Sequence, residues 1–453
     1  MLKEEQRAGA VGVLRGSSSS RIDDWIRGPT FWMTLREWLV LIALVLSPMS
    51  YMIKLVYDLP FTWIDPTLVV GALAALLPPW SLEFHDRRLR SVAACAALFL
   101  GTYWFSAIAA VATAQFPGAE AFREPVRTFL GILLCIGCVR AWRERSALRR
   151  AAVVLGWVAV VEVVIAAYLL IGLALDLPMP AAWRTYQEAY WFRQAFYAGK
   201  IVWPRLGGTF VEAPPFGLYV LGALITLSSA RRGVEPGRPA AMPGRWMDAI
   251  LWIGLAGSLS SQVLIGAVLW GLLYMGFDLY MRRQPTWRHA LAIAALVTVF
   301  SGGIYRKYLE SRHSGPAIGQ SVGERRAHTV RVWHTFLEHP VLGVGPGQYG
   351  EVAMRETFSQ YDPRVSPQFA AAEILADAGA LGFAAAMLMV GSVIYALFQA
   401  RDYAGVSAAT GLIVADSFQA NWRWPMVFIA IAMLLSATAP GMAGERQDPS
   451  TSH

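Results

Sequence analysis

The chain has 453 residues, of which 56% are hydrophobic and only 15% are charged. Soluble domains carry about 25% charged residues, so this composition excludes an ordinary soluble enzyme. Together with a mean hydropathy of +0.43, it indicates a protein that crosses a membrane several times. The net charge of +8 does not indicate nucleic-acid binding, because the basic residues largely occupy loops between apolar stretches.

The chain begins with a polar segment that contains GSSSSR and lacks the apolar core of a signal peptide. We therefore expect residues 1–36 to form a disordered cytoplasmic tail and residues 441–453 to form a second one. Between them, 37–440 is predicted to be a single all-α transmembrane domain, because no stretch resembles a soluble domain and no internal repeat is found.

Twelve apolar segments follow one another along this domain and are predicted to be transmembrane helices. The region 247–280 allows two interpretations: one long tilted helix, or two short helices that break near Ser258–Ser261. The predicted segments are 37–56, 66–82, 91–114, 125–142, 150–177, 212–230, 247–259, 260–280, 286–303, 369–399, 403–418 and 424–440.

The loops between these segments alternate in charge. The loops near 57–65 and 115–124 are acidic or close to neutral. Every second loop is basic, and these loops are 83–90, 143–150, 231–245, 281–289 and 400–402. Since basic loops stay in the cytoplasm, the alternation predicts that both termini are cytoplasmic, and it supports the count of twelve helices.

Two loops on the predicted outer side are long, 178–211 and 304–368, and both are rich in basic residues. Charge on that side does not orient the protein, and long loops in a compact fold are usually functional. Most of the aromatic residues in these loops are expected to be interfacial anchors. Arginine, however, suits phosphate or diphosphate, because the guanidinium donates two parallel hydrogen bonds. The basic residues are Arg184, Arg193, Lys200, Arg205, Arg306, Lys307, Arg312, Arg325, Arg326, Arg331, Arg355 and Arg364.

The segment 369–399 contains two carboxylates, Glu373 and Asp377, which are four residues apart and so lie on one face of a helix. We expect them to face a polar cavity rather than lipid, because ionisable side chains are costly in contact with lipid. Asp416 and the turn 421–423 are further polar candidates. The stretch HPVLGVGPGQYG (339–350) is predicted to form a tight re-entrant turn, since it lacks the lysine and helix of a phosphate-binding loop.

Three motifs occur in order: RLGGTF before an apolar helix, Arg325 followed by HPVLGVGPGQYG, and AEILADAGALGF at the start of a helix. With these motifs, over about 201–385, the chain resembles the O-antigen ligase and O-antigen polymerase superfamily of bacterial membrane glycosyltransferases. The resemblance implies an inverting transferase that needs no metal or cofactor and acts at the periplasmic face of the inner membrane. Its donor would be a glycan on undecaprenyl diphosphate.

The resemblance assigns the donor's diphosphate to Arg205 and Arg325, with Arg326 and Arg331 as neighbouring alternatives. Ligases of this superfamily carry a histidine eleven residues before a GxxG motif, which here begins at Gly379. The matching position is Gln368, and glutamine cannot act as a general base. We therefore expect a polymerase of O-antigen or exopolysaccharide repeat units rather than a ligase.

In place of that histidine, Glu212 is expected to act as the base or to orient the acceptor hydroxyl. The alternative for Glu212 is a carboxylate stabilised by the helix dipole and paired with Arg205. Glu373, Gln368 and His328 are expected to line the substrate site. His328, His334 and His339 are also alternatives for the base.

The expected partners are the lipid-linked glycan donor, a glycan acceptor, the lipid bilayer and a chain-length regulator or export protein, with no nucleic acid. A rival function of another class is a non-catalytic transporter of lipid-linked glycans, whose arginines would only bind. Transporters often show internal repeats, which this sequence lacks.

Overall fold

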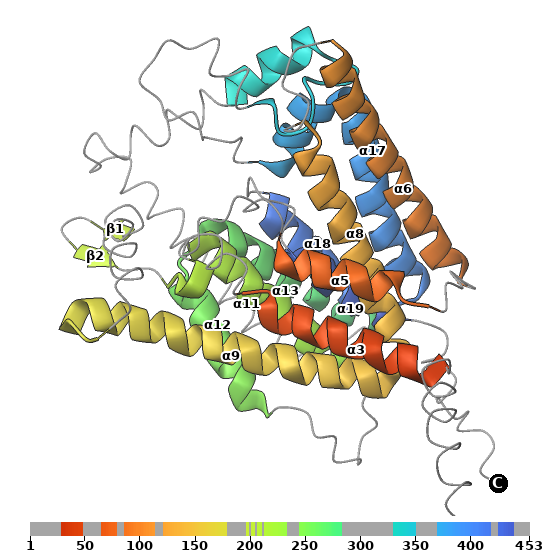
Figure 1. Ribbon diagram of the computed structural model, residues 1–453. Coiled ribbons are helices and arrows are strands. Elements are labelled where there is room, and N and C mark those ends of the chain that lie inside the picture. Colours follow the sequence, from red (N-terminus) through yellow and green to blue (C-terminus); the bar gives the residue numbers. More distant parts are fainter. Residues whose placement is uncertain are drawn as a thin grey trace, which may run out of the picture.

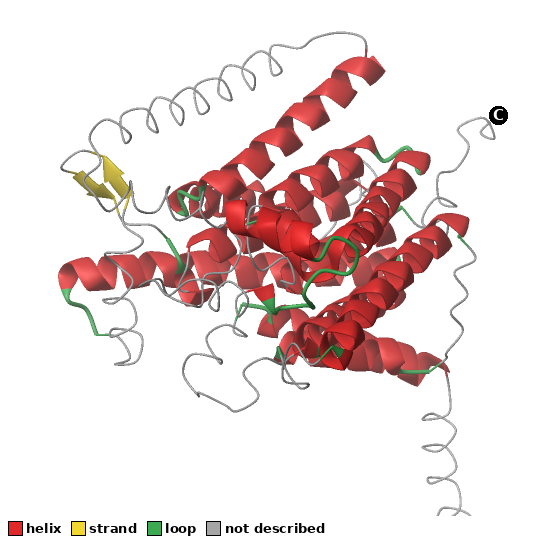
Figure 2. Ribbon diagram, turned by 90° about the horizontal axis from the view of Figure 1, so that it is seen from above, coloured by secondary structure: helices red, strands yellow, loops and turns green. Residues whose placement is uncertain are grey.

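A computed structural model of the protein describes residues 29–48, 65–78, 86–113, 121–178, 196–198, 201–203, 206–210, 213–232, 244–282, 329–349, 369–417 and 425–438. These residues are almost entirely helical, as predicted (Figure 1). The helices pack against one another in a single bundle (Figure 2).

The helices in chain order are α3 (Pro29–Leu46), α5 (Pro66–Leu76), α6 (Arg87–Ala112), α8 (Arg123–Ala141), α9 (Arg145–Leu175), η1 (Gly208–Phe210, a 3₁₀ turn), α11 (Ala213–Arg232), α12 (Arg245–Gly257), α13 (Ser261–Arg282), α17 (Ala370–Gln399), α18 (Tyr403–Ser417) and α19 (Pro425–Ala437). Residues 329–338 form a further helix. Because α3 begins at Pro29, the prediction of a disordered tail is wrong for 29–36; the rest of that tail lies outside the described residues.

Local sequence explains where several helices begin and end. Asp65 and Asp86 precede α5 and α6, and each carboxylate accepts a hydrogen bond from the backbone N–H two residues later. α5 stops early because Leu77 precedes Pro78 and is extended, with ψ of 141°. Between α12 and α13 the helical path is interrupted at Leu259, where φ is 47°. The interpretation of 247–280 as two helices is therefore the correct one.

Five of the described helices are long and apolar enough to cross a membrane: α6, α9, α11, α13 and α17. Every predicted segment contains a helix except 286–303, which lies outside the described residues. The described helices do not, however, support twelve spans. As described, α5, α12, α18 and α19 have 11 to 15 residues, or roughly 17 to 23 Å, which is shorter than a hydrocarbon core of about 30 Å.

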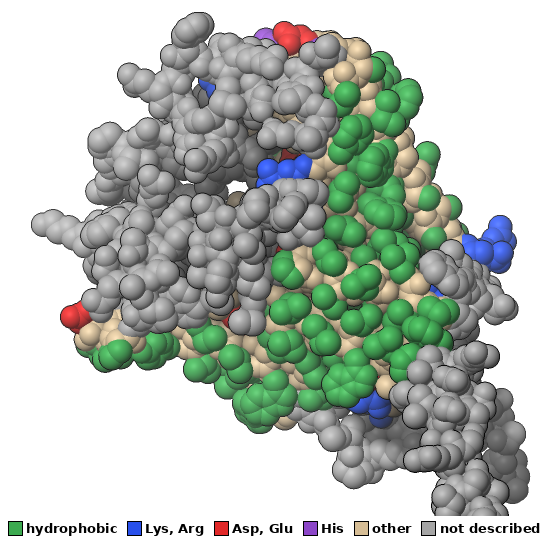
Figure 3. Space-filling view, viewed as in Figure 1, with side chains coloured by type: hydrophobic (Ala, Val, Ile, Leu, Met, Phe, Trp, Pro, Cys, Tyr) green, Lys and Arg blue, Asp and Glu red, His purple; other side chains and the backbone are tan. Residues whose placement is uncertain are grey.

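Apolar side chains cover a broad face of the bundle (Figure 3). α6 and α17 pack side by side beneath part of this face (Figure 1). Half or more of the surface of several of their large apolar side chains is exposed, and examples are Leu98, Phe105, Leu388, Tyr395 and Phe398. Soluble monomers rarely expose apolar surface of this extent. The face supports a membrane-embedded protein.

The helix that follows the RLGGTF motif, α11, is the most enclosed of the five long apolar helices. It packs against α9, α12, α13, α18 and α19. Of its apolar stretch, 89% is buried in the protein, against 22–44% in the other four long apolar helices. Its polar side chains Thr226 and Ser229 are buried with it. α11 therefore forms the centre of the bundle.

The only strands among the described residues form a small antiparallel hairpin, β1 (Phe196–Ala198) and β2 (Ile201–Trp203), with Tyr197 opposite Val202. The hairpin lies at the edge of the bundle (Figures 1 and 2). It belongs to the predicted outer loop 178–211, for which the sequence suggested no strand.

Helix ends from distant parts of the chain meet in two groups. In the first group, the Thr209 hydroxyl donates to the carbonyl oxygen of Pro48 at 3.1 Å. The Leu206 N–H donates to the carbonyl oxygen of Gly257 at 2.9 Å. These four residues belong to helix ends or loops that the charge alternation assigns to the outer side of the membrane.

The second group surrounds the C-terminal end of α5, whose last carbonyl groups have no partner within the helix. Two buried arginines from other helices, Arg36 of α3 and Arg140 of α8, donate to these carbonyls. Positive charge is favoured there because it complements the helix dipole. The accepting residues are Ala74, Ala75, Leu77 and Pro78. The charge alternation assigns all of these helix ends to the cytoplasmic side of the membrane.

Candidate functional site

α17 is broken two residues after Asp377, the second acid of its pair. Gly379 has φ of 63° and ψ of −163°, a conformation that glycine adopts readily and other residues rarely do. The helix continues on both sides of this residue. A break frees backbone N–H and C=O groups, and in a membrane these must be satisfied by other parts of the protein.

The stretch HPVLGVGPGQYG satisfies them. Two of its N–H groups donate to carbonyls before the break, and two of its carbonyls accept from N–H groups after the break. The four bonds are Val344 N to Ala376 O (3.0 Å), Gly345 N to Asp377 O (2.9 Å), Ala380 N to Pro340 O (2.8 Å) and Leu381 N to Val341 O (3.3 Å). We call this interlocked unit, 339–349 together with 376–381, the clamp.

The clamp requires glycine where its two backbones cross. A Cβ atom on Gly343 would lie 2.4 Å from the carbonyl oxygen of Ala376. A Cβ atom on Gly379 would lie 2.4 Å from the carbonyl carbon of Val341. From α6, the hydroxyl of Ser106 reaches carbonyl oxygens of both halves: Leu342 at 2.6 Å and Asp377 at 2.9 Å. The predicted re-entrant turn is thus a turn folded onto a broken helix.

The acidic pair lies inside the protein. Glu373 is 7% exposed and Asp377 is fully buried, in agreement with the expectation that neither faces lipid. The Asp377 carboxylate accepts a hydrogen bond from the N–H of Gly347 at 2.8 Å. The Asp377 side chain therefore connects the first half-helix of α17 to the glycine-rich part of 339–349.

The helix 329–338 is attached to the clamp by a small apolar cluster of Val332, Val344, Tyr349 and Ala376. Arg331 precedes Val332 in this helix and is partly exposed. His334 is exposed and His339 is partly exposed. Of the predicted substrate-site residues, the structure thus brings Arg331 and Glu373 onto two elements that pack together.

The RLGGTF motif folds onto a second buried carboxylate. Glu162, in the middle of α9, is 3% exposed. Its Oε2 accepts hydrogen bonds from the N–H of Thr209 at 3.3 Å and from the Thr209 hydroxyl at 3.0 Å. Gly208 has φ of 56°, and a Cβ atom there would lie 3.0 Å from the same oxygen. Gly208 of the motif therefore allows the turn to approach the acid.

Glu162 is a candidate site residue that lies outside the three sequence motifs. Its signal in the sequence is the isolated acid in VVEVV, within the predicted span 150–177. A charge in such a run is a functional candidate by default. Motif spacing does not single it out, because it belongs to no motif and lies far in sequence from Thr209.

No family model matches this chain, and no curated protein matches it either. The function is therefore inferred from the site itself and from the motifs.

The remaining predicted site residues fall outside the described part of the chain. They are Arg205, Glu212, Arg325, Arg326, His328 and Gln368. Arg205 directly precedes the described turn 206–210, and Glu212 directly precedes α11. Asp416 is buried near the end of α18, whereas 421–423 is not described.

The described residues offer acid groups and backbone dipoles for chemistry. They include no cluster of three or more histidine, cysteine, aspartate or glutamate side chains arranged to hold a metal ion. Buried carboxylates in a low-dielectric site can orient a hydroxyl group or accept its proton more strongly than carboxylates in water.

Proposed function

We propose that the protein is an inverting membrane glycosyltransferase that joins repeat units linked to undecaprenyl diphosphate into O-antigen or exopolysaccharide at the periplasmic face of the inner membrane. The observation that supports this most is the clamp. Its halves come from HPVLGVGPGQYG and AEILADAGALGF, two of the three motifs on which the resemblance rests. Because these two motifs are separate in sequence but joined by backbone hydrogen bonds, we take them to be parts of one site.

In the proposed reaction, a sugar hydroxyl of the acceptor attacks the anomeric carbon of the donor sugar. A new C–O bond forms while the bond to the diphosphate breaks, so the configuration at that carbon inverts. The hydroxyl proton passes to a base, for which Glu212 is our first candidate. Undecaprenyl diphosphate leaves with the electron pair, and Arg205 and Arg325 stabilise its charge without a metal.

The described carboxylates have supporting roles in this scheme. Glu373 is proposed to orient the acceptor near Gln368, with Arg326, Arg331 and His328 binding sugar or phosphate groups. Glu162 is proposed to act as a positioning residue, because it fixes the turn 206–210 directly after Arg205. A ligase would use the same donor with another acceptor, and glutamine in place of the ligase histidine favours the polymerase.

A transporter of lipid-linked glycans is the second candidate, and the break at Gly379 is the observation that favours it. Broken helices that expose backbone groups to a substrate are common in transporters. In the clamp, however, the freed backbone groups are bonded to the protein's own loop. The two functions differ in outcome, because only the enzyme makes a glycosidic bond and releases undecaprenyl diphosphate.

The test is a reaction of the purified protein, in liposomes, with repeat units on undecaprenyl diphosphate. We expect longer glycans and released undecaprenyl diphosphate, with activity persisting in EDTA. Arg205→Lys and Arg325→Lys should each lower the rate at least tenfold, because lysine keeps the charge but loses the two parallel hydrogen bonds.

Arg184→Lys is the matched control, since an interfacial anchor needs only a charge near the lipid head groups. It should retain the rate of the unmodified protein at equal protein level. Movement of the lipid-linked unit across the liposome membrane without any new glycosidic bond would establish the transporter instead. Unchanged rates for both lysine variants would remove these arginines from the diphosphate site.

A further inference from the structure

The helix 329–338, which is attached to the clamp, has one buried side and one exposed apolar side. Residues three and four positions apart share a side of a helix. Val332 and Thr335 lie on the side that is buried in the protein. Val330, Trp333 and Leu337 lie on another side, and more than half of each side chain is exposed. Single exposed apolar residues are common on proteins, but three large ones on one side form a stripe that water covers poorly.

The third side of this helix is polar. Arg331, His334 and Glu338 repeat the spacing of the apolar stripe one position further along the chain. His334 and Glu338 are exposed, and Arg331 is partly exposed. The surface of the helix is thus divided between protein, an apolar surrounding and a polar one. Such a division is typical of a helix that lies in the plane of the membrane surface.

The apolar stripe continues into the lipid-facing surface of the bundle. Val341, four residues after Leu337, is also more than half exposed. Its carbonyl oxygen accepts a hydrogen bond from the N–H of Leu381 in α17 at 3.3 Å. Leu381 is half exposed and lies seven and fourteen residues before Leu388 and Tyr395, and therefore on the same side of α17. The helix 329–338 thus adjoins a surface that lipid covers.

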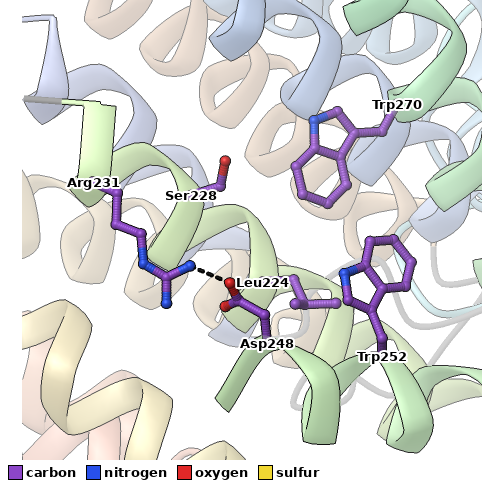
Figure 4. Close-up of a pocket in the computed structure, with 6 residues that line it drawn as sticks. All are labelled: Leu224, Ser228, Arg231, Asp248, Trp252 and Trp270. Atoms are coloured by element: carbon purple, nitrogen blue, oxygen red, sulfur yellow. Dashed lines mark hydrogen bonds and ion pairs between the residues drawn. The ribbon is translucent and has the colours of Figure 1, made fainter. Parts of the chain in front are cut away.

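The lengths of the neighbouring helices place the clamp at the outer boundary of the hydrocarbon core. Charged side chains mark the helix ends that the charge alternation assigns to the cytoplasm. α6 begins at Arg87, and Arg231 donates to Asp248 in the pocket between α11, α12 and α13 (Figure 4). Ser106, whose hydroxyl contacts both halves of the clamp, lies about 29 Å along α6 from Arg87. The second half of α17, 380–399, is about 30 Å long, as is a typical hydrocarbon core, which is about 30 Å thick.

The direction of the helix fits this position. Figure 1 draws it in cyan beside the upper ends of α6 and α17, and its axis runs transverse to theirs. A helix at the boundary of the core that runs across the spanning helices lies along the membrane surface.

We propose that the helix 329–338 binds the outer leaflet as an interfacial helix, with acyl chains of the leaflet phospholipids covering Val330, Trp333 and Leu337. Its polar side faces water and the lipid head groups. Because Val332 joins the helix to the apolar cluster of the clamp, the leaflet supports the clamp from outside. The inference rests on the membrane location and not on the proposed glycosyltransferase activity.

The test measures the depth of nitroxide spin labels on single cysteines of the full-length protein, whose three native cysteines are replaced by alanine. The protein is reconstituted in liposomes of phosphatidylethanolamine and phosphatidylglycerol. Oxygen, which concentrates in lipid, and a nickel chelate, which stays in water on both sides, compete to relax each label. Labels at 330, 333 and 337 should favour oxygen and lie about 5–10 Å into the boundary between head groups and acyl chains. Labels at 334 and 338 should favour the nickel chelate.

A charge in the stripe should lift the helix out of the leaflet. Leu337→Asp should shift the label of Trp333→Cys toward the nickel chelate, because a carboxylate is costly among acyl chains. His334→Asp is the matched control, since it adds an acid to the polar side and should leave that label in place. Stripe labels that favour the nickel chelate would show that water covers the stripe. Stripe labels shielded from both reagents would show that protein covers it, either this chain or a second copy. Each result would overturn the proposal, as would equal shifts from the two aspartate variants.

Discussion

Gly379 carries the backbone reversal on which the clamp depends, and its substitution gives the first prediction. Gly379→Ala should lower the free energy of unfolding by about 3 kcal/mol, because alanine is strained at positive φ and its Cβ would meet the backbone of Val341. The measurement is the melting temperature of the purified protein, followed by tryptophan fluorescence.

Gly391→Ala provides the control within the same helix. A Cβ atom there meets nothing within 4 Å, so the free energy of unfolding should change by less than about 1 kcal/mol. Equal melting temperatures for the two variants would show that the break does not need glycine.

The acidic side chains of the site could be predicted from sequence, but their partners could not. Glu373 and Asp377 are conspicuous because they are charges in an apolar run, and the structure buries both. The bond from Gly347 to Asp377 joins residues 30 positions apart, and no local pattern encodes such a pairing. The break at Gly379 could not be predicted either, because the apolar stretch continues through it and a single glycine does not by itself indicate an interrupted helix.

The C-terminal end of α5 provides a prediction about a whole helix. Arg36 donates from two of its nitrogens to three carbonyl oxygens at distances of 2.7 to 3.1 Å. Arg36→Lys should lower the free energy of unfolding by about 1–3 kcal/mol, because one ammonium cannot reach all three acceptors and buried carbonyls are left unsatisfied. Thermal unfolding in detergent measures the effect.

Arg90→Lys, in the first turn of α6, is the comparison, because Arg90 is exposed and its replacement should change the free energy of unfolding by less than about 0.5 kcal/mol. If the Arg36→Lys protein is as stable as the Arg90→Lys protein, then Arg36 does not stabilise the C-terminal end of α5.

The existence of the helices was easier to predict than their lengths. Apolar runs identify helical segments because the backbone must satisfy its own hydrogen bonds in lipid. The length of each helix depends on single residues within or next to the apolar run. α5 ends where Leu77 precedes a proline, and α12 ends where Ser258–Ser260 interrupt the path toward α13. The hairpin had no signal in the hydropathy pattern, because its strands have only three residues each.

The arrangement of the whole molecule bears on its orientation in the membrane. The contacts of Pro48, Thr209 and Gly257 gather ends that the charge pattern assigns outside. The contacts of Arg36 and Arg140 gather ends assigned inside. A reporter fused after Gly233 should therefore behave as cytoplasmic, and one inserted within 314–321 should behave as periplasmic.

Alkaline phosphatase and a fluorescent protein, which are active on opposite sides of the inner membrane, measure this directly. Fusion at both positions should give opposite results with each reporter. Two positions on the same side would discard the alternation on which the orientation rests, and a cytoplasmic result at 314–321 would place the loop 304–368 in the cytoplasm.

The enclosure of α11 has a consequence for how the protein is made. Synthesis proceeds from the N-terminus, so α11 enters the membrane when α9 is present but α18 and α19 have not yet been translated. Those two late helices cover part of α11 in the finished protein. Until α18 and α19 have emerged, α11 lacks the part of its enclosure that these two helices supply. The ribosome-bound chain therefore passes through a stage in which one side of its future centre is uncovered, and a nonsense mutation before α18 would leave it in that state for membrane proteases to remove.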